Sequence, residues 1–131
     1  DSVAITLDNG VRSVLGPKVS VVGGAELGCA LLTSPKVMTF TGQWEPTGSA
    51  CPDHNDYWSK LLAAKNPDVV IMLMGAWDLY ARDWGNGVVA PGDPEFDQHY
   101  RTAINETLSA LAADGAELVV ASLEEAIGLM G

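Results

Sequence analysis

The sequence predicts an α/β fold in which helices cover both faces of a parallel sheet. Stretches with a helical apolar period alternate with short, continuously apolar stretches, and glycine or proline separates them. A strand that is buried on both faces needs apolar side chains throughout, whereas a helix that covers a sheet needs only one apolar stripe. Alternation of the two, with helices of ten or more residues, indicates right-handed crossovers and a doubly wound sheet.

The first helix is expected over residues 3–15, and a strand should follow it. Apolar side chains recur there at steps of three and four, the period of one helix face, until Gly16-Pro17 ends the pattern. The members of this stripe are Val3, Leu7, Val11, Val14 and Leu15. Residues 18–22 are short, rich in valine and closed by Gly23-Gly24, so we expect them to form a buried strand.

Residues 23–50 predict mostly loop, because Gly, Thr, Pro and Ser are frequent there. An apolar patch at residues 37–40 could be either a short edge strand or loop packing. The second helix should begin at a cap, Asp53 or Asn55, and end near Asn66-Pro67, where proline forbids continuation. Its apolar face carries Tyr57, Trp58, Leu61 and Leu62.

Residues 69–74 predict the clearest strand, because every one of them is apolar. A third helix is expected to start in the Pro-Gly-Asp-Pro stretch of residues 91–94 and to continue to Asp114-Gly115. Its core-facing stripe consists of Phe96, Tyr100, Ile104, Leu108 and Leu111. Residues 117–121 predict another strand, and residues 123–130 could be a short helix or a tail.

One strand is missing from this pattern. A doubly wound sheet ordinarily has a strand directly before its first helix, whereas this sequence starts with Asp1-Ser2 where that strand would end. We therefore expect residues 1–131 to form one partial domain without its first strand. In a flavodoxin-like order the missing strand would lie between the second and the third. Residues 18–22 and 69–74 should then be separated by a void or drawn into a non-native pairing.

The charge and the apolar stretches exclude several classes of partner. The 131 residues carry 17 acidic and 7 basic side chains, so the formal charge is -10. Such a field repels nucleic acids and anionic lipid headgroups. The longest apolar stretch, residues 69–77, is far shorter than the roughly 20 residues that cross a bilayer. No initiating Met or signal-peptide pattern is present, so a targeting segment, if there is one, should lie outside these residues.

The cysteine count permits two interpretations. Cys29 and Cys51 could form a disulfide that closes the loop between them, or they could be two reduced, buried thiols. The first interpretation implies an oxidising compartment. Two cysteines without a CxxC spacing are too few for a metal knuckle. The acidic pairs Asp78/Asp83 and Asp93/Asp97 are better explained by helix capping and a solvated acidic face, so no metal is assigned.

Three loops should meet where the parallel strands end, which is where open α/β sheets bind ligands. They are Asp1-Ser2, residues 23–28 and the segment Gly75-Ala76-Trp77-Asp78. A serine at the start of a helix can act as a nucleophile whose oxyanion intermediate is held by backbone N–H groups. From spacing alone, a helix cap is the better explanation of Ser2, and the glycines are ordinary turn-forming residues.

The blocks resemble a known family when they are taken in order. Asp1-Ser2 is similar to the end of a Gly-Asp-Ser motif, Gly28 to a second-block glycine, and residues 75–78 to a Gly-x-Asn-Asp block. These are motifs of the SGNH (GDSL-type) hydrolases. The order Gly28-Cys29, Cys51 with Trp58, Gly75-x-Trp77-Asp78 and then Gly92-Asp93-Pro94-x-Phe96-Asp97 more specifically resembles the extracytoplasmic SGNH domains fused to membrane-bound acyltransferases of the acyltransferase-3 type.

The resemblance implies a flavodoxin-like SGNH fold and acyl-ester chemistry. Ser2 would be the nucleophile, Asp1 part of its motif, and the backbone N–H groups of Ser2 and Gly28 the oxyanion donors. Trp77 stands where the family has an oxyanion Asn, so its indole N–H would have to donate from another direction. Gly75, Asp78 and Trp84 are expected to contact the substrate. No cofactor is implied.

The family's base is missing from this sequence. The family ends on an Asp-x-x-His block that supplies the base and its orienting carboxylate, and no such pair follows residue 121. His54 is expected in a loop or cap and His99 on a solvated helix flank, so neither stands in the expected position. Without a base these residues alone should be nearly inactive. Trp58 is expected in the core, whereas Trp77 and Trp84 could equally line a sugar-binding groove.

Two functions therefore remain open. One is an esterase or O-acyltransferase that acts on an acylated small molecule, glycan or lipid outside the cytoplasm and is tethered through a fused membrane acyltransferase region. The other is a non-catalytic recognition domain that keeps the fold. A flavodoxin-like nucleotide-binding domain is disfavoured, because no G-x-G-x-x-G or P-loop lysine follows a strand.

Overall fold

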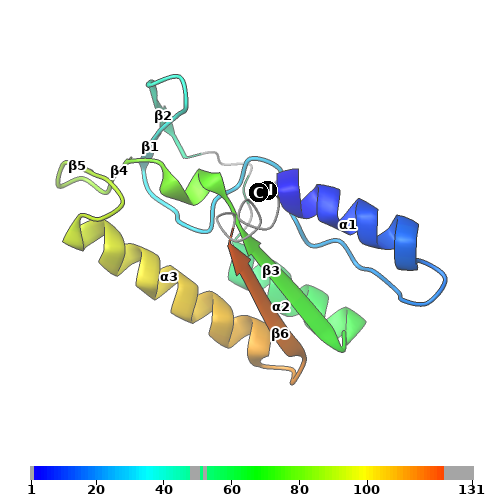
Figure 1. The fold of residues 1–131 in the computed structure, drawn as a ribbon. Coiled ribbons are helices and arrows are strands. Elements are labelled where there is room, and N and C mark those ends of the chain that lie inside the picture. The colour runs from blue at the N-terminus through cyan, green and yellow to red at the C-terminus, as the bar shows by residue number, and fades with distance from the viewer. Residues whose placement is uncertain (1, 48–50, 52, 123–131) are drawn as a thin grey trace.

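The computed structural model of the chain describes residues 2–47, 51 and 53–122. Helices and strands alternate through the second half of the chain, as the sequence predicts (Figure 1). In chain order the elements are α1 (Ser2–Leu15), β1 (Lys36–Met38), β2 (Trp44–Pro46), α2 (His54–Lys65), β3 (Val69–Met74), the 3-10 helix η1 (Ala76–Leu79), β4 (Arg82–Asp83), β5 (Val88–Val89), α3 (Pro94–Ala112) and β6 (Glu117–Ser122).

The parallel pair β3 and β6 is the centre of the fold. Their register runs from Val69 opposite Glu117 to Met74 opposite Ser122. On one face of the pair, Leu62 of α2, Met72 of β3 and Leu111 of α3 form the buried core cluster. This α/β arrangement confirms the predicted helices and the predicted parallel pairing. The wider flavodoxin-like order remains a prediction, because the parallel sheet in the described residues has two strands.

Local sequence signals set the ends of α2 and α3. Asp53 caps α2, and its Oδ1 accepts a hydrogen bond from the Asp56 N–H at 3.2 Å. The helix ends at Asn66, which adopts φ 44° and donates its N–H to the Leu62 carbonyl at 2.7 Å. Pro94 begins α3, at a position where a backbone N–H would have no partner within the helix, so the missing N–H of proline costs no hydrogen bond. The sequence predicted these boundaries because each depends on neighbouring residues.

A second, antiparallel sheet was only partly expected. It has the strand order β2-β1-β4-β5, with Val37 of β1 opposite both Glu45 and Arg82. Residues 37 and 38 of the apolar patch therefore belong to a strand and not to loop packing, but β1 has a partner on each side and is not the edge strand expected. Strands this short carry almost no periodicity, so their pairing is decided by tertiary contacts.

The prediction of a strand over residues 18–22 was wrong. Lys18 belongs to the turn that ends α1, residues 19–22 have no sheet partner, and Val19 and Val22 remain 42% and 43% exposed. A cavity of about 430 Å³ separates this segment from β3, and the apolar side chains of α1 line its other wall. A strand requires a neighbour at about 4.8 Å. Both this segment and β3 line the cavity, which agrees with the expected void and not with a non-native pairing.

The two faces of the parallel pair are covered differently. Figure 1 shows α3 on one side of β3 and β6 and α1, with the loop that follows it, on the other. None of the residues of α1 is buried, and Ile71 of β3 is 54% exposed.

Within the described residues no helix combines the length and the apolar character needed to cross a membrane.

Candidate active site

Three segments line one end of the cavity of about 430 Å³ between α1 and β3, which is called the large cavity below. Ala4 from the first turn of α1, Gly24 and Cys29 from the following loop, and Gly75 and Asp78 from the segment after β3 all contribute to its wall. In Figure 1 the first turn of α1 lies at the end of the molecule where β3 and β6 end. The structure thus places the first turn of α1, part of the loop of residues 23–28 and the segment after β3 at one cavity, although Ser2 and Gly28 are not among its lining residues.

Ser2 is the first residue of α1 and is exposed. Its carbonyl accepts a hydrogen bond from the Thr6 hydroxyl at 2.9 Å, so the first turn is closed from within the helix. The free N–H groups and the positive end of the dipole at a helix start favour a developing negative charge. Asp1, the other residue of the predicted motif, lies outside the described residues.

Gly28 lies in a turn that is tied to the start of α2. Its φ is +70°, a left-handed conformation that glycine adopts without strain. The next residue, Cys29, forms a disulfide with Cys51, which decides between the two interpretations of the cysteines. A hydrogen bond of 2.7 Å between His54 Nε2 and the Ala30 carbonyl holds the same loop. The backbone around Gly28 is therefore fixed from two directions.

Asp78 is buried, which corrects the expectation of a cap or a solvated acidic face. It is 3% exposed, and its Oδ1 accepts the Leu32 N–H at 2.9 Å. Burial raises the pKa of Asp78, while the hydrogen bond from Leu32 and the charge of Arg82 oppose that rise. The cap interpretation failed because the donor lies 46 residues away in the sequence. By contrast, Asp83, Asp93 and Asp97 do accept bonds from nearby backbone N–H groups.

Sequence reasoning missed Arg82. This residue of β4 is 1% exposed, and its guanidinium donates to Ser34 Oγ at 3.1 Å and to the Trp77 carbonyl at 3.0 Å. Burial lowers the pKa of Arg82, and the nearby charge of Asp78 raises it. The available signal was a pair of opposite charges four residues apart, Asp78 and Arg82, but such pairs are commonest on exposed helices.

The two tryptophans with predicted site roles lie in different surroundings. Trp77 is half-buried in η1, with its ring edge against Tyr80 at a centroid distance of 5.5 Å. Trp84 donates its indole N–H to the Thr33 carbonyl at 2.9 Å and stacks on His99 at 4.0 Å. Among the described residues, neither tryptophan lines the large cavity. Trp84 is instead held against α3.

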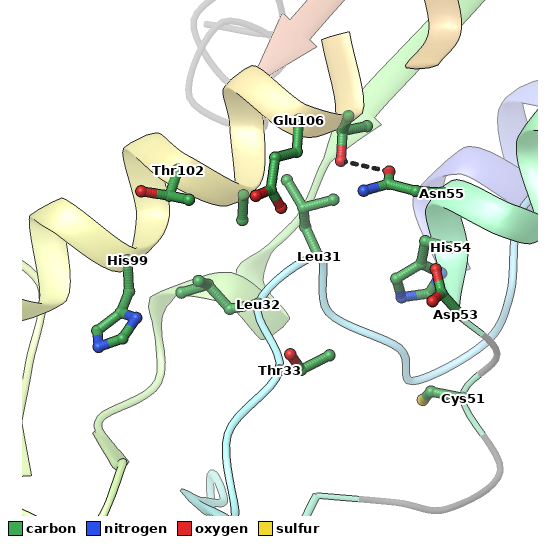
Figure 2. A pocket seen from close by; sticks show the side chains of 12 residues that line it. Leu31, Leu32, Thr33, Cys51, Asp53, His54, Asn55, His99, Thr102 and Glu106 are labelled. Carbon is green, nitrogen blue, oxygen red and sulfur yellow. Dashed lines mark hydrogen bonds between the residues drawn. The ribbon is translucent and has the colours of Figure 1, made fainter. Parts of the chain in front are cut away.

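A second cavity, of about 420 Å³, lies between α3, the start of α2 and residues 31–33 (Figure 2). His99 and His54 lie at its opposite ends. His54 is buried, being 7% exposed, and stacks on Trp58, whereas His99 is half-buried by its stacking on Trp84. Both histidines are therefore less solvated than expected, although His54 does open α2.

No group of three potential metal-binding side chains occurs within the part of the chain that the structure describes.

Trp58 matches its predicted role, because it packs on the core cluster and donates its indole N–H to the Gly24 carbonyl at 2.8 Å. That hydrogen bond connects α2 to the loop that lines the large cavity.

A family model described as the SGNH domain (fused to AT3 domains) matches residues 1–122. The chain belongs to this SGNH family. No curated protein and no solved structure matches it. The match confirms the resemblance read from the motif blocks, and it associates the SGNH domain with hydrolase and acyltransferase-related chemistry and with fusion to an acyltransferase region.

Neither histidine of the described residues has a position that marks it as the family's base. His54 lines both cavities, yet its Nε2 is engaged by the Ala30 carbonyl. His99 lines the second cavity and not the one shared by Ala4 and Gly75. The grouping of Ser2, Gly28 and the segment after β3 into one site stays a prediction.

Proposed function

We propose that this SGNH domain transfers or hydrolyses acyl esters through Ser2. The observation that carries the proposal is the shared cavity, in which the first turn of α1, the loop next to Gly28 and the Gly75–Asp78 segment meet within a chain of the SGNH family. Asp1 belongs to the same motif. Gly75 and Asp78 would contact the substrate. Trp84 does not line the cavity, so it would contact only a substrate that extends beyond it.

In the proposed reaction, Ser2 Oγ attacks the acyl carbonyl carbon while a base takes the hydroxyl proton. The resulting oxyanion accepts hydrogen bonds from the backbone N–H groups of Ser2 and Gly28. The alcohol leaves with a proton, and the acyl group remains on Ser2. It then passes to water in hydrolysis or to an acceptor hydroxyl in transfer. We place the base outside residues 2–122.

The substrate would be an acylated glycan or lipid of the cell surface, or a related small molecule. The Cys29–Cys51 disulfide favours an oxidising, extracytoplasmic compartment. The family's fusion to AT3 domains supports tethering through a membrane acyltransferase region. The net charge of -10 disfavours nucleic acid as a partner.

The test uses the natural polypeptide that carries this chain, with a small acetyl ester as substrate and a phosphonate ester as covalent probe. We expect Ser2→Ala to abolish both turnover and labelling, with the label mapped to Ser2 by mass spectrometry. Ser13→Ala is the matched control, because Ser13 is an exposed serine on the same helix. Turnover that survives Ser2→Ala would reject the proposal.

The alternative is a recognition domain that keeps the fold without the chemistry. It is favoured by the engagement of both histidines in ring stacking, with Trp58 and with Trp84. In that case the natural polypeptide would bind an acylated glycan with equal affinity before and after Ser2→Ala, and the phosphonate would not label it. Calorimetric titration of both forms separates the two functions.

A further inference from the structure

A buried guanidinium joins the segment that follows β3 to the stretch of chain that follows Gly28. Arg82 Nη2 donates to the carbonyl of Trp77, in the segment that follows β3. Arg82 Nη1 donates to Ser34 Oγ, in the stretch of chain that continues from Gly28. Because a guanidinium is planar and rigid, two bonds from one fork fix the direction as well as the distance between their acceptors.

Asp78 makes a second connection between the same segments. It follows Trp77 directly and accepts the Leu32 N–H at 2.9 Å, two residues before Ser34. Asp78 is 3% and Arg82 1% exposed, so water screens the attraction between their charges only weakly. The pKa shifts have the same cause, because burial disfavours each charge while the opposite charge supports it.

The orientation of Arg82 indicates a geometrical role. Its Nε is buried and has no hydrogen-bond partner among the described residues, although its two terminal nitrogens are both engaged. Leaving a buried donor unsatisfied is unfavourable, and a buried charge pair is seldom more stabilising than apolar side chains of the same volume. The arrangement therefore fixes the positions of the two acceptors, Ser34 and Trp77, more than it stabilises the fold.

We propose that Arg82 is a positioning residue for the oxyanion site. It acts through the Trp77 carbonyl and Ser34, and so sets the segment after β3 against the loop that contains Gly28. The proposal rests on the proposed acyl-ester function. A shift of about 1 Å in a catalytic group commonly lowers a rate about 100-fold, so the geometry of this link should be visible in kinetics.

The experiment measures kcat, KM and boronic-acid affinity in the natural polypeptide with an acetyl ester. Arg82→Lys keeps the charge but loses the fork, and Arg82→Met keeps the length without either bond. For both we expect kcat to fall about 100-fold and KM to stay within about twofold. Boronate affinity should fall in parallel with kcat, because a boronate mimics the tetrahedral intermediate. Arg101→Met is the control, because Arg101 is an exposed arginine on α3, and it should change none of these values.

Ser34→Ala keeps the test decisive if Arg82→Met does not fold. It removes one of the two acceptors, and we expect a loss of about tenfold in kcat and in boronate affinity. Unchanged kcat and boronate affinity in Ser34→Ala and in Arg82→Lys would overturn the proposal. A rise in KM that accounts for the whole loss of kcat/KM would overturn it as well.

A readout without turnover separates this proposal from the proposed function. Hydroxyl-radical footprinting should show faster oxidation of Trp77 in Arg82→Lys, with the core residue Trp58 unchanged. A general loosening of the fold would expose both rings. If ester hydrolysis survives Ser2→Ala, the proposed function fails, and Arg82 is then judged by footprinting, where equal oxidation of Trp77 in Arg82→Lys and wild type overturns its positioning role.

Discussion

The two sides of the parallel pair β3–β6 differ in how completely their apolar side chains are covered. On the α2–α3 side, Leu62, Met72 and Leu111 are no more than 7% exposed. On the α1 side, Leu7 is 43% exposed, and the cavity of about 430 Å³ lies between the helix and β3. Both sides have helices with a regular apolar stripe. The difference shows that a stripe becomes a core only where strands fill the sheet beneath it.

The difference also bears on function. The residues proposed for catalysis belong to the open side or to its border, where the first turn of α1 and the Gly24–Cys29 loop line the cavity. Regions with few buried contacts open with the lowest free energy, and binding loops are commonly found there. The closed side thus supplies a rigid frame, and the disulfide and the Trp58–Gly24 hydrogen bond connect the open side to it.

The largest expected effect is the difference in stability loss between two leucine substitutions, one on each side of the parallel pair. Leu62→Ala should lower the free energy of unfolding by roughly 2–5 kcal/mol, because it leaves a cavity in the core cluster. Leu7→Ala should lower it by less than about 1 kcal/mol, because that side chain is already partly exposed. Urea denaturation of the two variants checks this. Equal losses would mean that the two sides are equally packed in solution.

Reducing the Cys29–Cys51 disulfide should have the next largest effect. Closing a loop with a sequence separation of 22 residues is worth about 3 kcal/mol through the entropy of the unfolded chain. Thermal unfolding with and without reductant should therefore show a lower midpoint in reductant. The double variant Cys29→Ser/Cys51→Ser serves as the control, and a reductant effect that persists in it would contradict the assignment.

Trp58→Phe should have a smaller effect, at the border between the two sides. It keeps most of the ring but removes the hydrogen bond to the Gly24 carbonyl, so we expect a loss of about 1 kcal/mol in the free energy of unfolding. Trp44→Phe is the matched control, because Trp44 is 37% exposed in β2. A loss no greater than in Trp44→Phe would show that the loop is held by other contacts.

The smallest effect is a change in the pH dependence of stability through Asp78. Burial raises the pKa of Asp78 in the folded state above its ordinary value of 3.8, so the folded protein holds this proton more tightly than the unfolded chain. Its contribution to stability consequently falls as pH rises from about 3.8 through the folded pKa. Asp78→Asn should remove this decline in acid denaturation curves, and Asp114→Asn, at an exposed position, should retain it.

Elements whose signals are local were predictable from the sequence. The continuous apolar stretch of β3 gave its bounds correctly, as did the Asp53 cap and the Asn66 end of α2. The three loops of the candidate site were also predictable, because parallel strands end at one edge of a sheet. Predictions failed where the partner is distant, as for Asp78 with Leu32 and Arg82 with Ser34.

The sequence by itself determined the helices, the two parallel strands and the order of the motif blocks, because helix caps and apolar periods act over a few residues. Only the tertiary structure decided that residues 18–22 remain unpaired, that Asp78 and Arg82 are buried together, and that Trp84 lies against α3. Each of these depends on what lies within a few ångströms in space. Strand pairing, burial and the pairing of charges are properties of that neighbourhood, which spacing along the chain does not specify.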